Sequence, residues 1–203
     1  MNIETEASEP TMGRRERRKR ATREALLEAA YELFAERGYH ETTVDEIADA
    51  AGVSRRTAFR YFPTKDSLVF SEREGRLERF KELLRDDPSL RPYDALRHAV
   101  LSLAVEYEEE KSYLLTQDAL VQATPELAGL ELRMDRDFEE AMVERLRGGR
   151  RSRAAARRAR VLGAAVMGVI RASLREWLDG GGKADLACLG EEAFRVLEEG
   201  VSV

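Results

Sequence analysis

The sequence predicts an all-α protein in two parts: an N-terminal three-helix domain that contains a helix-turn-helix, followed by a larger helical domain. Three observations lead to this fold class. Apolar residues recur at the three- and four-residue spacing of amphipathic helices through most of the 203 residues. Capping residues, glycines and prolines fall between these segments, where helices start and stop. Charged residues make up 36% and apolar residues 43%, which suits helices with well-solvated outer faces.

The first part spans residues 12–64 and follows a polar, acidic tail, residues 1–11, that we expect to be disordered. It opens with a dense basic stretch from Gly13 to Arg23, which leads into a helix that Gly38 ends. The basic stretch either follows DNA phosphates or forms a solvated helix start, and its composition fits both. One stripe of the helix is apolar and predicts its buried face: Leu26, Ala29, Ala30, Leu33 and Phe34.

The segment from Thr42 to Leu68 indicates two short helices joined by a tight turn. Its start and stop signals stand in the order that a helix-turn-helix needs: Thr43 with Glu46 as a capping box, Gly52 at the turn, Ser54 as a second cap, Pro63 as a stop, and Thr64 as a third cap before Lys65. The whole order, more than any single signal, predicts this motif.

The second of these helices, Arg55 to Phe62, points an unusual set of side chains outward: Arg55, Arg56, Thr57, Arg60 and Tyr61. Guanidinium groups can bind guanine edges and hydroxyls can bind phosphates, so this helix fits the major groove of DNA. The alternative is a solvated surface helix with a chance excess of arginine. The distribution of charge favours DNA binding. Residues 12–65 hold 12 Lys or Arg and 9 Asp or Glu, a net charge of +3, so the remaining residues must carry −8 to give the overall net charge of −5.

In the second part, residues 65–203, we expect one continuous helix from Lys65 to Arg85. Further helices are predicted over residues 93–107, 112–123, 125–147 and 152–179, followed by a final helix that contains Leu186 to Leu197. Pro92 and the Thr124-Pro125-Glu126 run mark helix starts. EEEK at 108–111 indicates a solvated corner.

The helix over residues 152–179 is apolar on most sides in its second half, and small residues recur there every fourth position: Ala164, Gly168 and Ala172. Such a surface lets another helix approach closely. We therefore predict that the last two helices pair with their copies in a second chain as a four-helix bundle. A core formed within one chain is the alternative.

The Thr42–Leu68 segment resembles the N-terminal DNA-binding domain of the TetR family of bacterial transcriptional regulators. The resemblance covers Ala21 to Leu68 and is carried by the threonine-capped helix, the Gly-Val-Ser turn, the following Thr and aromatic run, and Lys65. By position it implies phosphate contacts for Thr43, Tyr61 and Lys65. It implies groove contacts for the reading helix that Ser54 caps: Arg55, Arg56, Thr57, Phe59 and Arg60. Arg56, Ala58 and Phe59 depart from the family's usual pattern, which leaves the operator sequence open.

The resemblance further implies that residues 65–203 bind a small effector and dimerise, and that the protein is a repressor released from a palindromic operator. An activator, or a regulator that needs a protein co-regulator, is the alternative. The run GVIRASLREWLDGG, which contains Arg171 and Arg175, together with the Arg-rich helix-turn-helix, resembles a mycofactocin-regulator-like branch of the family, some members of which respond to acyl-CoA thioesters.

Candidate effector-pocket residues are flexible, aromatic or charged groups in the apolar segments: Tyr113, Met134, Phe138, Met142, Met167 and Arg171. Plain core packing is the alternative for the apolar ones. Arg171 and Arg175 each need a partner in an apolar helix, either a carboxylate or an anionic head group.

Other classes of protein find little support. The sequence has no nucleophile–base pair, phosphate-binding glycine loop or metal-ligand spacing, so we expect no enzyme, cofactor or metal. No apolar run approaches the roughly 18 residues of a membrane span, so we expect a cytoplasmic protein without membrane contact. The single cysteine, Cys188, excludes an internal disulfide and lies in an apolar stripe, where we expect it to be packed.

Overall fold

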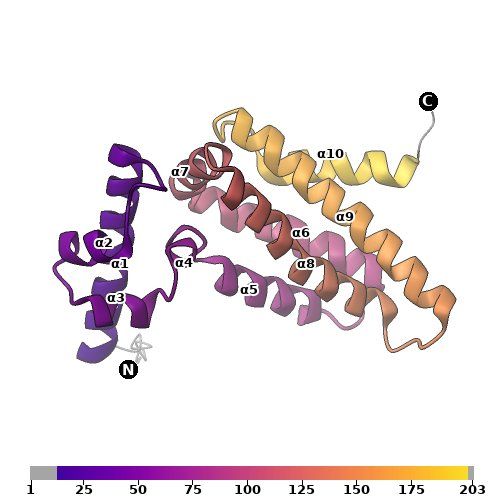
Figure 1. Cartoon of the computed structure of the whole chain (residues 1–203). Helices are drawn as coiled ribbons and strands as arrows, with labels where there is room; N and C mark the ends of the chain where they lie inside the picture. Colours follow the sequence, from indigo (N-terminus) through magenta and orange to yellow (C-terminus); the bar gives the residue numbers. More distant parts are fainter. Residues whose placement is uncertain (1–12, 201–203) are drawn as a thin grey trace, which may run out of the picture. The chain divides into compact units, whose positions relative to one another are not determined.

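A computed structural model of the chain describes residues 13–200, which form ten helices and no strand within that range (Figure 1). The predicted all-α class is confirmed. The chain divides into two compact units, Met1–Ser71 and Glu72–Val203, called here the N-terminal and C-terminal units. The expected disordered tail, residues 1–11, lies outside the described residues.

The N-terminal unit contains α1 (Arg14–Arg37), α2 (Val44–Ala50), α3 (Arg55–Tyr61) and α4 (Lys65–Val69). All five stripe residues predicted for α1 are buried, as are residues contributed by the three shorter helices and their ends: Ile47, Ala48, Ala58, Phe62, Leu68 and Val69. One small core thus joins the four helices. The basic stretch is the exposed first part of α1, so it is helical.

The continuous helix expected from Lys65 to Arg85 was wrong: α4 ends at Val69, and α5 begins at Arg73. Leu68, Val69 and Phe70 are all buried, and three consecutive residues of one helix cannot all face the same core. Side chains of α1 bind the backbone that the break frees. Tyr31 donates to the Val69 carbonyl at 3.2 Å, and Arg23 donates to the Ser71 carbonyl at 2.8 Å.

The C-terminal unit contains six longer helices: α5 (Arg73–Asp86), α6 (Pro92–Glu109), α7 (Lys111–Gln122), α8 (Pro125–Arg147), α9 (Arg153–Asp179) and α10 (Leu186–Glu199). Pro92 and Pro125 occupy first-turn positions, as predicted, and the corner at Glu110 separates α6 from α7. Ser152 and Asp185 cap α9 and α10 with their side chains. Thr124 stands at the cap position of α8, but its side chain makes no capping bond.

Two apolar clusters form the core of this unit. The larger joins α5, α6, α8, α9 and α10 around Phe80, Leu96, Met142, Val166 and Phe194. The smaller joins α6, α7, α9 and α10 around Trp177, whose indole N–H donates to the Ala184 carbonyl at 3.0 Å. Gly163 allows α8 and α9 to approach closely, because a Cβ there would lie 3.0 Å from a methyl group of Val143.

Cys188 is exposed, so the expectation that it is packed was wrong. The buried stripe of α10 consists of Leu186, Gly190 and Phe194. Cys188 is two residues from Leu186 and from Gly190, which places it on the opposite side of the helix.

Candidate nucleic-acid interface

The start of the candidate reading helix, α3, is fixed by the residues that the sequence indicated. The Ser54 hydroxyl accepts a hydrogen bond from the Thr57 backbone N–H at 3.2 Å and lies 2.9 Å from the Thr57 hydroxyl. Gly52 adopts φ = 66° at the turn between α2 and α3. On the inner side Ala58 and Phe62 are buried. The small Ala58 side chain therefore sets how closely α3 approaches the rest of the unit.

The outer side of α3 presents guanidinium groups and aromatic rings together. Arg56 and Arg60 are exposed, and among the described residues neither has a carboxylate partner. The Arg60 guanidinium lies 5.4 Å from the Tyr61 ring centroid, and the Arg55 guanidinium lies 5.4 Å from that of Phe59, which is 37% exposed. Cations held against aromatic faces lose side-chain freedom while keeping their donors available.

Arg55 has a second role, because it also faces α2. Its Nε lies 3.0 Å from Asp45 Oδ1, close enough for an ion pair, although that oxygen has no hydrogen bond with correct geometry in the described part of the chain. Both side chains are largely exposed, so the pair contributes little to stability. Arg55 can therefore leave Asp45 and bind another anion that attracts it more strongly.

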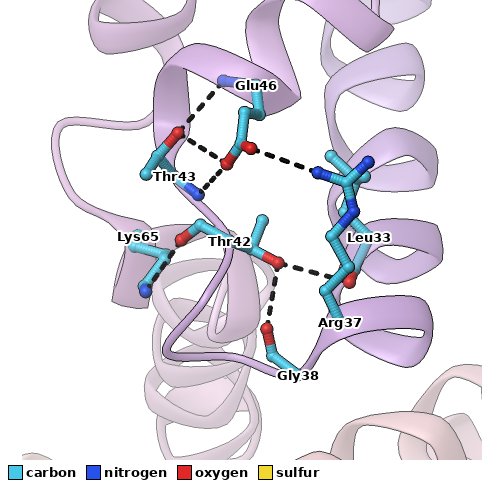
Figure 2. A network of polar contacts seen from close by, with 7 residues as sticks. All are labelled: Leu33, Arg37, Gly38, Thr42, Thr43, Glu46 and Lys65. Atoms are coloured by element: carbon cyan, nitrogen blue, oxygen red, sulfur yellow. Dashed lines mark hydrogen bonds and ion pairs between the residues drawn. The ribbon is translucent and has the colours of Figure 1, made fainter.

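The start of α2 forms the predicted capping box (Figure 2). The Thr43 backbone N–H and hydroxyl donate to Glu46 Oε2 at 2.9 and 2.8 Å, and the Glu46 N–H donates back to the Thr43 hydroxyl at 3.3 Å. The bond from the Thr43 backbone, followed by that from its hydroxyl, lowers the pKa of Glu46. Arg37 of α1 lies 3.1 Å from the other carboxylate oxygen, which links α1 to α2.

Lys65, for which the family resemblance implies a phosphate contact, lies under the loop that precedes Thr43. Its ammonium group donates to the carbonyls of Tyr39, Thr42 and His40 at 2.6, 2.9 and 3.4 Å. No sequence pattern predicts this network. Thr42, which is buried, stands directly before Thr43 in the sequence. Lys65 is 23 residues from Thr42, and no helical periodicity relates the two positions.

The structure brings three of the six residues predicted for an effector pocket together and places the other three elsewhere. Met142 and Met167 are buried in the larger core cluster with Phe138 beside them, whereas Tyr113 packs against the smaller cluster. The Met134 carbonyl accepts a bond from Arg73 at 2.7 Å. Arg171 pairs with Asp135 at 2.8 Å, and Arg175 pairs with Asp118 at 2.5 Å. Carboxylates of the same chain thus supply the partners that both arginines need.

A feature that the sequence analysis missed is a hollow of about 180 Å³ along α5 and α6. Its lining mixes acids, arginines and apolar groups: Glu72, Gly75, Arg76, Arg79, Leu103, Glu106, Tyr107 and Glu110. The Arg76 guanidinium lies 4.9 and 5.4 Å from the ring centroids of Tyr107 and Tyr113, and its partner Glu110 lies 2.6 Å away. Arg76 is 31 residues from Tyr107, so no sequence spacing indicated this arrangement.

Residues 13–200 also lack two features that other functions would need. No group of three or more His, Cys, Asp or Glu side chains there lies close enough to hold a metal ion. No helix in that range is long and apolar enough to span a membrane.

Comparison with known proteins agrees with this geometry. Residues 26–71 match the model of bacterial regulatory proteins of the tetR family, and residues 90–202 match the MftR C-terminal domain. The putative mycofactocin biosynthesis transcriptional regulator MftR of Mycobacterium tuberculosis is 33% identical over 138 residues, 66% of this chain and 70% of that protein.

Solved structures share the fold across nearly the whole chain. FadR of Thermus thermophilus, a TetR family transcriptional repressor solved in complex with lauroyl-CoA, is 31% identical, with a TM-score of 0.53 over 89% of this chain and 95% of that one. FadR of Bacillus subtilis, in complex with stearoyl-CoA, is 23% identical, with a TM-score of 0.55 over 88% and 98%, and supports the fold alone. The chain therefore belongs to the TetR family of bacterial transcriptional regulators, and its helix-turn-helix is the DNA-binding motif of that family.

Proposed function

We propose that this protein is a cytoplasmic, homodimeric repressor that releases its operator when a long-chain acyl thioester binds the C-terminal unit. The observation that carries the DNA-binding step is the pair of exposed guanidinium groups, Arg56 and Arg60, on a helix capped at Ser54 and stopped at Pro63. Thr43, Thr57, Phe59 and Tyr61 complete the proposed contact surface. Phosphate contacts should make operator affinity fall steeply with salt.

The operator is found by sequencing the DNA fragments that co-purify with the protein. On that DNA, Arg56→Ala or Arg60→Ala should reduce the preference for operator over random duplex by about 5- to 150-fold, because each good base contact discriminates by roughly 1–3 kcal/mol. Arg136→Ala is the matched control, since it removes the same charge from an exposed site on α8 in the C-terminal unit. Unchanged preference in both α3 variants would refute the placement of the reading helix.

The proposed dimer uses the outer faces of α9 and α10. Val161 and Val196 are 62% and 69% exposed, and the small residues Ala164, Gly168 and Ala172 lie open on the same stretch of α9. A second copy packed there would cover these groups as a four-helix bundle and present two α3 helices to half-sites about 34 Å apart. The double variant Val161→Asp/Val196→Asp should sediment as a folded monomer. A dimer that persists unchanged would exclude this interface.

The effector class is inferred from the lauroyl-CoA bound by the Thermus relative at 31% identity. Two features of this chain support it. The larger apolar cluster contains the flexible side chains of Met142 and Met167, with the Phe138 ring packed against it, and side chains of this kind can rearrange around an acyl chain. Arg76 offers a mostly buried guanidinium whose partner, Glu110, is 46% exposed and can be displaced by an anionic group.

Titration of the operator complex separates the parts of this ligand. Lauroyl-CoA should release the DNA, whereas coenzyme A alone and short free acids should not. No release by acyl thioesters of any chain length would exclude the effector class while leaving the DNA-binding proposal intact. A reporter assay in a deletion strain distinguishes the alternative, because loss of a repressor raises expression of its targets and loss of an activator lowers it.

A further inference from the structure

The first part of α1, residues 13–20, carries a concentration of positive charge that the proposed contact surface does not include. These residues, called here the basic arm, hold six Arg or Lys and one Glu, and all of them are exposed. The match to the tetR family begins only at residue 26, which is also the first buried position of α1. The basic arm is therefore a feature of this chain that neither the family match nor the core of the unit accounts for.

Four side chains of the basic arm have no counter-charge. Arg20 pairs with Glu24 at 2.7 Å. No carboxylate in the described part of the chain pairs with four others: Arg14, Arg15, Arg18 and Lys19. Like charges four residues apart on a helix are unfavourable, as are cations in its first turns, and Gly13 supplies no side-chain cap. An array of negative charge beside the arm would remove these penalties.

The helical spacing of α1 places part of the basic arm on the side that meets α3. The Arg23 guanidinium lies 5.5 Å from the ring centroid of Phe62, the residue that ends α3. Lys19 and Arg15 stand four and eight residues before Arg23, so they lie on the same side of α1, about 6 and 12 Å further along its axis. Arg60 of α3 is exposed two residues before Phe62. One cationic surface thus continues from the reading helix onto α1.

We propose that the basic arm is a second DNA-binding surface, which binds phosphates of the duplex through Arg15 and Lys19 without reading its sequence. The inference rests on the proposed use of α3 as the reading helix. Guanidinium and ammonium groups both bind phosphates strongly. A helix with its side chains is about 10–12 Å across and does not fit a minor groove about 6 Å wide, which leaves the phosphates. The arm contains no apolar side chain that would enter a membrane surface.

The first experiment measures affinity against salt concentration for the double variant Arg15→Gln/Lys19→Gln, on the operator and on a random duplex. Each phosphate contact contributes about 0.9 to the slope of log affinity against log salt. The proposed dimer has two arms, so the slope should fall by about 3.6 on both duplexes, while the preference between them is kept. A fall of less than about 0.9, which is one contact per dimer, would overturn the proposal. Arg133→Gln/Arg136→Gln removes the same charge from exposed positions of α8 and should leave the slope unchanged.

A second experiment needs no variant, so it remains decisive if the arm of the double variant unfolds. Hydrogen exchange of the backbone amides of residues 17–20 is measured without DNA and with a saturating random duplex at low salt. Exposed helical turns with like charges should open readily in the free protein, and bound phosphates should slow the exchange about tenfold or more. Equal exchange in the two states would overturn the proposal.

The two measurements also separate this proposal from the proposed function. A slope that depends on the arm, in a protein without preference for any operator, would defeat the reading role of α3 and leave the role of the arm in place. Binding of no duplex at all by the unchanged protein would defeat both.

Discussion

The two units use polar side chains in different ways. In the N-terminal unit they bind mainly backbone: Thr42, Lys65, Arg23 and Tyr31 all donate to carbonyls distant in sequence. In the C-terminal unit charged side chains bind one another between helices, in the pairs Arg73–Asp137, Arg76–Glu110, Arg79–Glu106, Arg97–Glu191 and Arg175–Asp118.

Helix length explains this difference. Helices α2, α3 and α4 have 7, 7 and 5 residues, too few to be stable alone, and their many unsatisfied ends must be bound individually. Helices α5 to α10 have 12 to 27 residues and bury long apolar stripes, so ion pairs are added to a core that already exists. Single polar atoms should therefore matter more in the N-terminal unit, and apolar volume more in the C-terminal unit.

The largest effect should come from Phe194→Ala, which tests how strongly the C-terminal unit depends on apolar volume. Phe194 is fully buried and packs edge-on against Tyr93, with ring centroids 6.2 Å apart. Its truncation should cost about 3–5 kcal/mol of unfolding free energy. Trp177, the one tryptophan of the sequence, lies in the C-terminal unit, so its fluorescence in denaturant reports this unit. Arg195→Ala, at the exposed neighbouring position, should stay within about 0.5 kcal/mol. Equal midpoints for the two variants would contradict the prediction.

Thr42→Val tests how much a single buried polar atom contributes to the N-terminal unit. The new side chain has nearly the same shape but leaves the carbonyls of Leu33 and Gly38 without their donor, at a cost of about 1–3 kcal/mol. Amide hydrogen exchange at Ile47 and Ala48 should accelerate accordingly, while the Trp177 transition stays in place because the contacts of Thr42 lie in the N-terminal unit. Thr116→Val is the control, since that exposed hydroxyl also donates to a carbonyl, at 3.0 Å, without burial. Unaltered exchange in Thr42→Val would remove the asymmetry between the units.

The range of each contact along the chain determines which features the sequence could predict. Caps, turn glycines and prolines act within a few residues, so the ends of α2 and α3, the start of α4 and the five buried residues of α1 were all readable. The α4–α5 break was not, because it depends on Arg23 and Tyr31, which lie about 40 residues away and bind the freed carbonyls.

The candidate sites also differ in whether they depend on local or on distant contacts. The outward side chains of α3 follow from one short segment, whereas the ammonium position of Lys65 and the placing of Arg76 between Tyr107 and Tyr113 depend on contacts between distant segments. Met142 and Met167 met the pattern for a pocket but are packed in the core, since the periodicity of a core stripe and of a pocket wall is the same.

Arg171→Met should have a small effect, which tests whether the interhelical pairs of the C-terminal unit are secondary to its core. Arg171 is 49% and Asp135 26% exposed, and pairs of this kind contribute roughly 0–1 kcal/mol. A double-mutant cycle with Asp135→Asn, read by Trp177 fluorescence, should give a coupling energy within that range that disappears at about 1 M salt. A coupling of several kcal/mol that persists in salt would place this pair among the main supports of the unit.

The smallest expected effect is the change of stability with pH at the α2 cap. It tests whether an exposed carboxylate of the N-terminal unit also acts by binding backbone. The bonds from the Thr43 N–H and hydroxyl favour the charged form of Glu46 and lower its pKa. The stabilisation is therefore fully present above the unfolded-state pKa, about 4.3, and is lost as pH falls through the lower folded-state pKa. A carboxylate titration by NMR should find the Glu46 pKa below that of an unfolded peptide, and Thr43→Ala should bring it back toward the ordinary value, because the donor hydroxyl is gone and the capping box is broken. If Thr43→Ala left the pKa of Glu46 unchanged, the Thr43 hydroxyl would contribute nothing to the shift, which would then come from the backbone N–H of residue 43 and from Arg37.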